Sequence, residues 1–198
     1  MKKILSAILM AAILLTSVLA FTACGGSASN PVLKVIDIPL TSEEYAFAVK
    51  KGDAELLASV NSFLAEIKAN GKFDQIVNKY FGDGTPTGVT SAAEDASKDQ
   101  LVVATNAAFA PFEYKEGDTY YGVDMEIMAA LAESLGRELV ISNMEFESVC
   151  TAVAEGMCDV AAAGLTVNEN RKKILDFSDS YYNASQVLIT KADDTTFD

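Results

Sequence analysis

The stretch Ala161–Arg171, AAAGLTVNENR, decides the expected fold. It begins at the end of an apolar run with the composition of a β-strand, and Gly164 stops that run. Asn168 is suited to start a helix whose first turns carry Arg171. Free backbone N–H groups would then lie beside the Thr166 hydroxyl and a guanidinium. Together these groups suit a carboxylate, although the stretch also fits an ordinary strand–turn–helix whose basic residues face solvent.

Strands and helices alternate around this stretch. We expect strands at residues 101–105, 138–142, 159–163 and 186–190, and helices at residues 123–136, 146–155 and 168–173. Such alternation predicts an α/β domain with a mainly parallel sheet flanked by helices. Ligands of these sheets bind outside the carboxyl ends of the strands. We therefore expect Asn106, residues 143–146 and residues 164–166 to meet at one edge of the sheet.

The N-terminal half carries elements of its own. Alternating apolar and polar residues predict strands at residues 32–38 and 44–50. Asp53 is suited to cap a helix over residues 54–69, in which apolar residues recur at helical spacing. The same spacing continues in a shorter helix over residues 73–81.

Residues 83–100 differ in composition from both halves. They are rich in Gly, Thr, Ser, Ala and Asp and contain almost no large apolar residue, which is typical of a linker. A linker of this length inside one compact domain is unusual. The sequence therefore suggests that two pieces, residues 32–82 and residues 101–198, have been joined.

Residues 1–23 have the pattern of a secretory signal peptide. Lys2 and Lys3 precede an apolar run too short for a comfortable membrane span, and small residues stand directly before Cys24. The pattern resembles a bacterial lipoprotein signal. That resemblance implies that Cys24 becomes a lipid-bearing N-terminus outside the cytoplasm, at the cell membrane, followed by a tether over residues 24–31. A plain signal peptide with cleavage nearby is the alternative.

The composition excludes several classes of function. Without Lys2 and Lys3, the 15 Lys and Arg residues fall to 13 against 28 Asp and Glu, a net charge of −15, which does not suit nucleic acid. The sequence has no histidine, which rules out Ser-His-Asp and Cys-His catalysis and histidine-based metal sites. We expect no metal and no cofactor. Cys150 and Cys158 can form a disulfide in an oxidising compartment or remain two small buried hydrophobes, and we favour the second interpretation.

Three stretches follow one another in a recognisable order and spacing over residues 101–191. They are LVVATNAAFAPFEY from Leu101, GVDMEIMAALAESLG from Gly122 and EFESVCTAVAEGMCDVAAAGLTVNENRKKILDFSDSYYNASQVLITK from Glu145. Together they resemble the first lobe of the extracytoplasmic solute-binding proteins of polar amino-acid ABC importers. The resemblance implies a type II periplasmic-binding-protein fold.

A fourth stretch, SEEYAFAVKKGDAELLASVNSFLAEIKANGKFDQIVNKYFGDG from Ser42, resembles the C-terminal end of the same family. In that family this end returns from the second lobe to complete the first, whereas here it comes first. The resemblance therefore implies a circularly permuted single lobe, in which residues 83–100 join the old termini. Residues 32–38 and 186–198 resemble the two hinge crossings. The chain would then be a truncated permutant, or a second lobe encoded elsewhere or self-association would supply the missing half.

The resemblance also implies a binding site for an amino acid. Arg171 would hold the ligand α-carboxylate, helped by the hydroxyl and the backbone N–H of Thr166. Ala163 and Gly164 would offer backbone groups to the α-ammonium or to the side chain of the ligand.

Four further positions follow from the same resemblance. Phe109 and Phe146 would sandwich the ligand side chain, whereas Phe112 is expected in the core. Asn106 stands where relatives often carry Asp, so a cationic ligand loses one partner here. In the family, the carboxylate that pairs with the α-ammonium comes from the second lobe.

Two classes of function remain. The first is a lipid-anchored lobe that binds an amino acid and delivers it to an ABC permease without catalysis. The second is an enzyme on the same fold, because related two-lobed proteins include dehydratases and lytic transglycosylases. An enzyme would need an acid and a base in the cleft, and only Glu113 and Glu145 are near candidates, neither in a recognisable catalytic motif. An extracytoplasmic sensor module is a weaker third interpretation.

Overall fold

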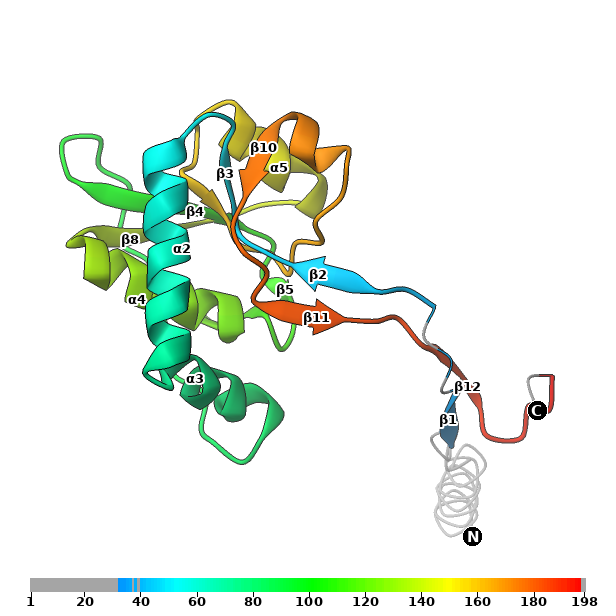
Figure 1. The fold of residues 1–198 in the computed structure, drawn as a ribbon. Helices are drawn as coiled ribbons and strands as arrows, with labels where there is room; N and C mark the ends of the chain where they lie inside the picture. The colour runs from blue at the N-terminus through cyan, green and yellow to red at the C-terminus, as the bar shows by residue number, and fades with distance from the viewer. Residues whose placement is uncertain (1–31, 37, 39, 197–198) are drawn as a thin grey trace, which may run out of the picture. The chain divides into compact units, whose positions relative to one another are not determined.

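The computed structural model describes residues 32–36, 38 and 40–196 and divides the chain into two compact units (Figure 1). The smaller unit contains β1 (Leu33–Ile36) and β12 (Leu188–Lys191), which pair antiparallel. The strand predicted over residues 186–190 therefore belongs to this two-stranded ribbon and not to the central sheet. Among the described strands, β12 forms its hydrogen-bonded ladder with β1 and not with a strand of the central sheet. The larger unit spans Pro39–Gln186.

A five-stranded sheet in the order β10–β3–β9–β4–β8 forms the centre of the larger unit. β4 (Gln100–Thr105) runs parallel to both of its neighbours, β9 (Val160–Ala161) and β8 (Glu138–Asn143). β3 (Ala48–Lys50) is antiparallel to β9 and to β10 (Leu175–Phe177). All strands except β3 therefore share one direction, and the predicted α/β fold with a mainly parallel sheet is confirmed.

Helices cover both faces of this sheet. They are α2 (Ala54–Ala69), α3 (Lys72–Phe81), α4 (Val123–Leu135) and α5 (Phe146–Ala154). Successive side chains of a strand point to opposite faces, so Val103 of β4 joins the core cluster that contains α2, α3 and α4. Its neighbour Ala104 joins the cluster that contains α5. Burial on both faces explains why β4 is apolar from Leu101 to Ala104.

α2 ties the N-terminal half to the rest of the unit. It begins as predicted, because the Asp53 side chain accepts a hydrogen bond from the Leu56 N–H at 3.0 Å. Its apolar side is buried in the same cluster as α4 and consists of Val60, Phe63, Leu64 and Ile67. Each such side chain stabilises the fold by about 1.5–3 kcal/mol. The N-terminal helices of this unit therefore share one core with its later residues.

The prediction of a single strand over residues 44–50 is wrong. The structure divides it into β2 (Glu43–Tyr45), which pairs with β11 (Tyr182–Ala184), and β3. Between the two strands the Phe47 N–H donates to the Ser178 hydroxyl at 3.1 Å. A side chain here replaces the next ladder partner, which interrupts the strand.

The prediction of an α-helix over residues 168–173 is also wrong. The structure has only a 3₁₀ turn, η1 (Arg171–Lys173), and the Asn168 side chain accepts the Arg171 N–H at 2.9 Å. β10 begins at Leu175, so the chain has no length left for an α-helix. An anion at this place would therefore meet side chains and single N–H groups rather than a helix N-terminus.

Residues 83–100, predicted as a linker, follow a defined path over the larger unit. Val89 is buried, and its N–H and C=O pair with the backbone of Tyr120 at 2.8 and 2.9 Å. The Thr87 N–H donates to Glu126 at 2.9 Å, and Glu126 also accepts hydrogen bonds from two side chains of α3. This segment is thus attached to both α3 and α4.

A small antiparallel sheet that the sequence analysis did not predict follows β4. It consists of β5 (Ala108–Phe109), β6 (Glu113–Glu116) and β7 (Thr119–Tyr121). Its strands are short and mostly polar, so they lack the apolar alternation that marks longer strands. The sheet places Phe109 opposite Glu113 at the carboxyl end of β4.

Candidate functional site

A pocket of about 320 Å³ opens at the carboxyl ends of β4 and β9, the edge at which the sequence predicted a ligand. This volume lies near the lower end of the range for small-molecule sites, about 300–1,000 Å³. The segment after β4, which includes β5 and the start of β6, and the loop after β9 form most of its wall, and β2 and the first residue of α5 complete it. The lining residues are Tyr45, Asn106, Ala108, Phe109, Glu113, Phe146, Ala163, Gly164 and Thr166.

Two aromatic rings are exposed at this pocket. Phe109 is 45% exposed and Phe146 is 37% exposed, whereas Phe112 is 5% exposed and lies in the core. The rings of Phe109 and Phe112 stack with their centroids 5.7 Å apart. The structure thus places Phe109 in the pocket and Phe112 beneath it, as predicted for both positions.

Gly164 allows the loop after β9 to approach Phe109 closely. Its φ of +48° is a conformation that side-chain-bearing residues rarely adopt, and a Cβ there would lie 2.9 Å from Phe109 Cε1. The Gly164 N–H donates to Asp124 Oδ2 at 2.9 Å. Because this N–H is already bonded, Gly164 can offer a ligand only its carbonyl group.

Arg171 lies beside the pocket and is not part of its lining. Its Nη1 donates to the Thr166 carbonyl at 2.7 Å, and its guanidinium carbon stands 5.3 Å from the centre of the Phe146 ring. The Thr166 hydroxyl donates to Glu43 Oε2 at 2.8 Å, and this hydrogen bond lowers the pKa of Glu43. A cation, a hydroxyl and a carboxylate therefore form one polar corner.

The backbone N–H of Thr166 points away from β2. Thr166 and Tyr45 form an antiparallel bridge whose two hydrogen bonds, at 3.2 and 2.9 Å, run through their chain neighbours. In such a pair the N–H and C=O of both residues face away from the partner strand. The Thr166 C=O accepts from Arg171, whereas no residue in the described part of the chain accepts a hydrogen bond from its N–H.

Asn106 helps to hold the loops after β4 and β8 together. Its Nδ2 donates to the Met144 carbonyl at 2.8 Å, and Asn143 Oδ1 accepts the Ala107 N–H at 2.8 Å. The predicted meeting of these loops at one edge is therefore confirmed. One N–H of the Asn106 amide is bonded to the protein, so the second N–H and the amide oxygen are the groups left for a ligand.

Two buried carboxyl groups lie at this site, Glu113 in the pocket lining and Asp124 behind Gly164. Glu113 lines the pocket and is 1% exposed, and Asp124 is fully buried. Asp124 accepts hydrogen bonds from the Tyr181 hydroxyl and the Gly164 N–H. Glu113 Oε2 has no hydrogen-bond partner among residues 40–196. Burial raises the pKa of both carboxyl groups, and the Asp124 charge raises the pKa of Glu113 further.

The structure brings six of the seven predicted ligand residues into one pocket, with Arg171 beside it. The sequence analysis missed Tyr45, Ala108 and Glu43, and it considered Glu113 only as a candidate catalytic acid or base. Tyr45 and Glu43 come from the N-terminal half, so their place in the site depends on tertiary packing that local pattern does not reveal.

The cysteines contribute no cross-link in the described part of the chain. Cys150 and Cys158 are free thiols, and burial raises the pKa of both. Cys158 is packed in the cluster beneath α5 and Cys150 borders that cluster, which fits our interpretation of both as small hydrophobes. Cys24, with the predicted signal peptide and tether, lies outside the described residues.

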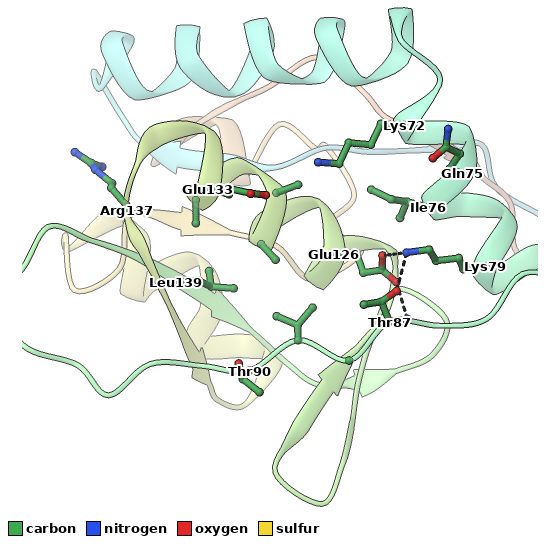
Figure 2. A pocket seen from close by; sticks show the side chains of 15 residues that line it. Lys72, Gln75, Ile76, Lys79, Thr87, Thr90, Glu126, Glu133, Arg137 and Leu139 are labelled. Carbon is green, nitrogen blue, oxygen red and sulfur yellow. Dashed lines mark hydrogen bonds and ion pairs between the residues drawn. The ribbon is translucent and has the colours of Figure 1, made fainter.

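Figure 2 shows a second hollow, of about 640 Å³, between α3, α4 and residues 87–90. Lys79 in this hollow is paired with Glu126 and Thr87. Arg137 is paired with Asp99 at 2.8 Å. Because these charges already have partners, we assign the ligand to the pocket at the strand ends.

The described residues hold no group of three or more Asp, Glu or Cys side chains that could bind a metal ion. Within the same residues, every helix is too short or too polar to cross a bilayer.

Comparison with known proteins gives one family model. The model described as bacterial extracellular solute-binding proteins, family 3, matches residues 6–83 and residues 101–197. The two matched segments cover well over half of the chain and leave out residues 84–100, within the segment that the sequence predicted as a linker.

Individual relatives match parts of the chain. The arginine-binding extracellular protein ArtP of Bacillus subtilis (strain 168) is 38% identical over 109 residues, which are 55% of this chain and 43% of that protein. A cyclohexadienyl dehydratase of Pseudomonas aeruginosa is 33% identical over 91 residues, 46% of this chain and 34% of that enzyme. A solved structure of an ancestral arginine-binding protein bound to arginine is 37% identical, with a TM-score of 0.41 over 43% of this chain and 38% of that chain. This chain thus spans less than half the length of these relatives.

Proposed function

We propose that this chain, which belongs to the bacterial extracellular solute-binding proteins of family 3, binds an amino acid for delivery to an ABC permease and catalyses no reaction. One observation carries the proposal. The pocket at the strand ends joins two exposed aromatic rings, Phe109 and Phe146, to the polar corner of Arg171 and Thr166. An amino acid offers an α-carboxylate to such a corner and a side chain to the rings.

The α-carboxylate would bind at Arg171 and Thr166. The unpaired Thr166 N–H and the nearby guanidinium supply a neutral and a charged donor from adjacent directions. A guanidinium can hold both oxygens of a carboxylate at once. The Glu43 carboxylate bonds to the Thr166 hydroxyl, so a ligand would have to rotate or displace that hydroxyl to use it.

The rest of the ligand would lie between Phe109 and Phe146. Both rings are partly exposed, and covering them with the apolar part of a ligand removes surface from water. Ala163 and Gly164 line the same pocket, and their carbonyl groups would accept hydrogen bonds from an ammonium group. Asn106 lines the pocket as well and would offer its amide oxygen.

We further propose that the chain acts as one lobe of a two-lobed receptor. The pocket is open on one side, and a small ligand is normally buried for most of its surface. A second lobe, from another chain or from a second copy of this one, would cover it. In this proposal residues 32–82 are the permuted C-terminal part of the lobe, and residues 83–100 join them to residues 101–198.

The location follows from the family and the N-terminal pattern. The family is described as extracellular. We propose that residues 1–23 direct export and that Cys24 carries the lipid that holds the protein at the membrane. A net charge of −15 after removal of the signal argues for a lipid anchor and not for charge attraction to an anionic membrane.

A second candidate, an enzyme of the dehydratase kind, is favoured by one observation. Glu113 is a buried carboxyl group at the pocket whose pKa is raised, as expected for a catalytic acid. Catalysis also needs a base in reach of the substrate. Asp124 is fully buried and accepts hydrogen bonds from Tyr181 and Gly164, so it cannot act as the base.

The test is titration of the purified protein with each of the twenty amino acids, followed by NMR chemical shifts. We expect one chemical class of amino acid to shift the resonances of Phe109, Phe146, Gly164 and Thr166. No shifts at these residues with any amino acid would overturn the proposal. Time-dependent loss of the added compound would instead favour the enzyme.

A further inference from the structure

The smaller unit of the chain carries a large share of the exposed apolar side chains. It comprises residues 1–38 and 187–198, of which the structure describes residues 32–36, 38 and 187–196. Six of the twelve large apolar side chains that are exposed in the described chain belong to it: Val32, Leu33, Val35, Ile38, Val187 and Ile189. Apolar surface gathered in this way marks a site of interaction.

Three of these side chains lie on one face of the ribbon that β1 and β12 form (Figure 1). Val35 stands opposite Ile189 and Leu33 stands opposite Lys191, and all four residues are exposed. Successive side chains of a strand alternate between faces, so the intervening residues of both strands share the other face, and these are less exposed. We call Leu33, Val35, Ile189 and Lys191 the ribbon face.

The ribbon is too small to be stable in water without a cover. β1 and β12 have four residues each, and the residues of these two strands belong to neither core cluster of the described chain. Two paired strands with no further layer are marginally stable at best. The ribbon face therefore requires a surface to lie against.

A lipid bilayer is the surface within reach of the ribbon. Only the eight residues 24–31 separate β1 and the preceding Val32 from the acylated end that we propose at Cys24. Eight residues span at most about 28 Å even when fully extended. A lipid at Cys24 thus keeps the start of the ribbon within that distance of the membrane.

The side chains of the ribbon face suit this surface. Apolar side chains can enter the boundary between headgroups and acyl chains, and the long stem of Lys191 allows its ammonium group to stay with the phosphates. The acidic Asp194 that follows β12 accepts a hydrogen bond from Thr190, on the other face, at 2.7 Å. A second copy of the chain suits the ribbon less, because two mature chains, each with a net charge of −15, repel each other.

We propose that the ribbon face lies on the lipid bilayer and gives the anchored protein a second contact with the membrane. This inference rests on the lipid anchor of the proposed function and is independent of the amino-acid site. Leu33, Val35 and Ile189 enter the outer layer of the acyl chains. Lys191 remains at the level of the headgroup phosphates.

The experiment uses the fact that the chain has no tryptophan, so a single introduced one reports its own position. The acylated protein with Val35→Trp is reconstituted in vesicles of equal parts phosphatidylglycerol and phosphatidylethanolamine. Lipids brominated on the upper part of their acyl chains quench a tryptophan at that depth. Met157→Trp is the matched control, because Val35 and Met157 are both 60% exposed and Met157 lies in the larger unit. We expect quenching at least about twofold stronger for Val35→Trp than for Met157→Trp.

Two further changes, each added to Val35→Trp, test the face itself. Ile189→Asp places a charge opposite the tryptophan on the ribbon face, whereas Thr190→Asp places one on the other face. We expect Ile189→Asp to remove the excess quenching and Thr190→Asp to preserve it. Both variants should keep the urea unfolding transition of the larger unit, because its core clusters contain neither residue.

Every other outcome overturns the inference. Equal quenching of Val35→Trp and Met157→Trp, quenching that survives Ile189→Asp, or an equal loss with Thr190→Asp refutes a contact by this face. A blue-shifted tryptophan in the unacylated chain from Gly25 onward, without vesicles and with a dimer in sedimentation, assigns the face to a second copy. The absence of lipid on Cys24 removes the anchor and this inference together. None of these results affects amino-acid binding, which the NMR titration tests by itself.

Discussion

Replacing Arg171 by alanine is the most direct test of the proposed carboxylate site. The guanidinium is held in place by one hydrogen bond to the Thr166 carbonyl and by the Phe146 ring, 5.3 Å away. Arg171 belongs to a three-residue turn and lies outside both core clusters. Its loss should therefore change ligand binding far more than folding.

The magnitude follows from these contacts. A charge-assisted hydrogen bond contributes about 1.5–3 kcal/mol, so Arg171→Ala should weaken binding about ten- to hundredfold. The lost cation–π contact should lower the free energy of unfolding by only about 0.5–1 kcal/mol. Arg171→Lys should recover part of the affinity, because an ammonium group cannot hold both carboxylate oxygens in the same way.

The assay is the same NMR titration, with urea unfolding of each variant as the measure of stability. Lys172→Ala is the matched control, because Lys172 is the next residue of the same basic run and pairs at the surface with Glu169. Equal weakening by Arg171→Ala and Lys172→Ala would mean that Arg171 acts only through surface charge. The pocket assigned around Ala163, Gly164 and Thr166 would then be wrong.

Four further predictions test other parts of the molecule. Glu126→Ala leaves the partly buried Lys79 and the Thr87 N–H without their acceptor, so we expect a loss of about 1–3 kcal/mol in urea unfolding. No measurable loss would show that the 83–100 segment is held by other contacts. Folded Glu113 keeps a proton that Glu113 of the unfolded chain loses above about pH 4, so the free energy of unfolding should fall as pH rises. Urea titrations at several pH values should show this fall, and Glu113→Gln should make it smaller. Cys24→Ser should abolish labelling of the protein by palmitate in cells, and equal labelling of the variant would refute the lipid anchor. Residues 98–198 produced alone should show no cooperative unfolding transition, because α2 and β3 complete both cores, and a fragment as stable as the whole chain would refute the single packed unit.

Local sequence pattern predicted the elements whose residues carry a regular signal. α2 follows from Asp53 and from apolar residues at helical spacing, and its observed bounds equal the predicted ones. β4 was extended by one residue, Gln100. The pocket residues that follow the strands, such as Asn106 and Thr166, were predicted because strand ends of a parallel sheet meet at one edge.

The parts that were missed depend on contacts between distant residues. The interruption between β2 and β3 needs Ser178 to reach Phe47, and nothing near Phe47 indicates this. Glu113 and Asp124 are charged residues in runs that pattern alone would place at the surface, yet both are buried. Their pairing at this site became visible only when α4 and β6 were placed together.

The position of β3 in the sheet sets the order in which the molecule can assemble. β3 lies between β9 and β10, with Ala48 opposite Ala161 and Lys50 opposite Leu175, although it is synthesised long before either partner. Contacts across such long separations require large loops to close first, and they are associated with slow folding. A growing chain that has passed α2 and α3 still has no sheet on which those helices can pack. We therefore expect the larger unit to fold only after nearly the whole chain has been synthesised, and the chain to remain unfolded until then.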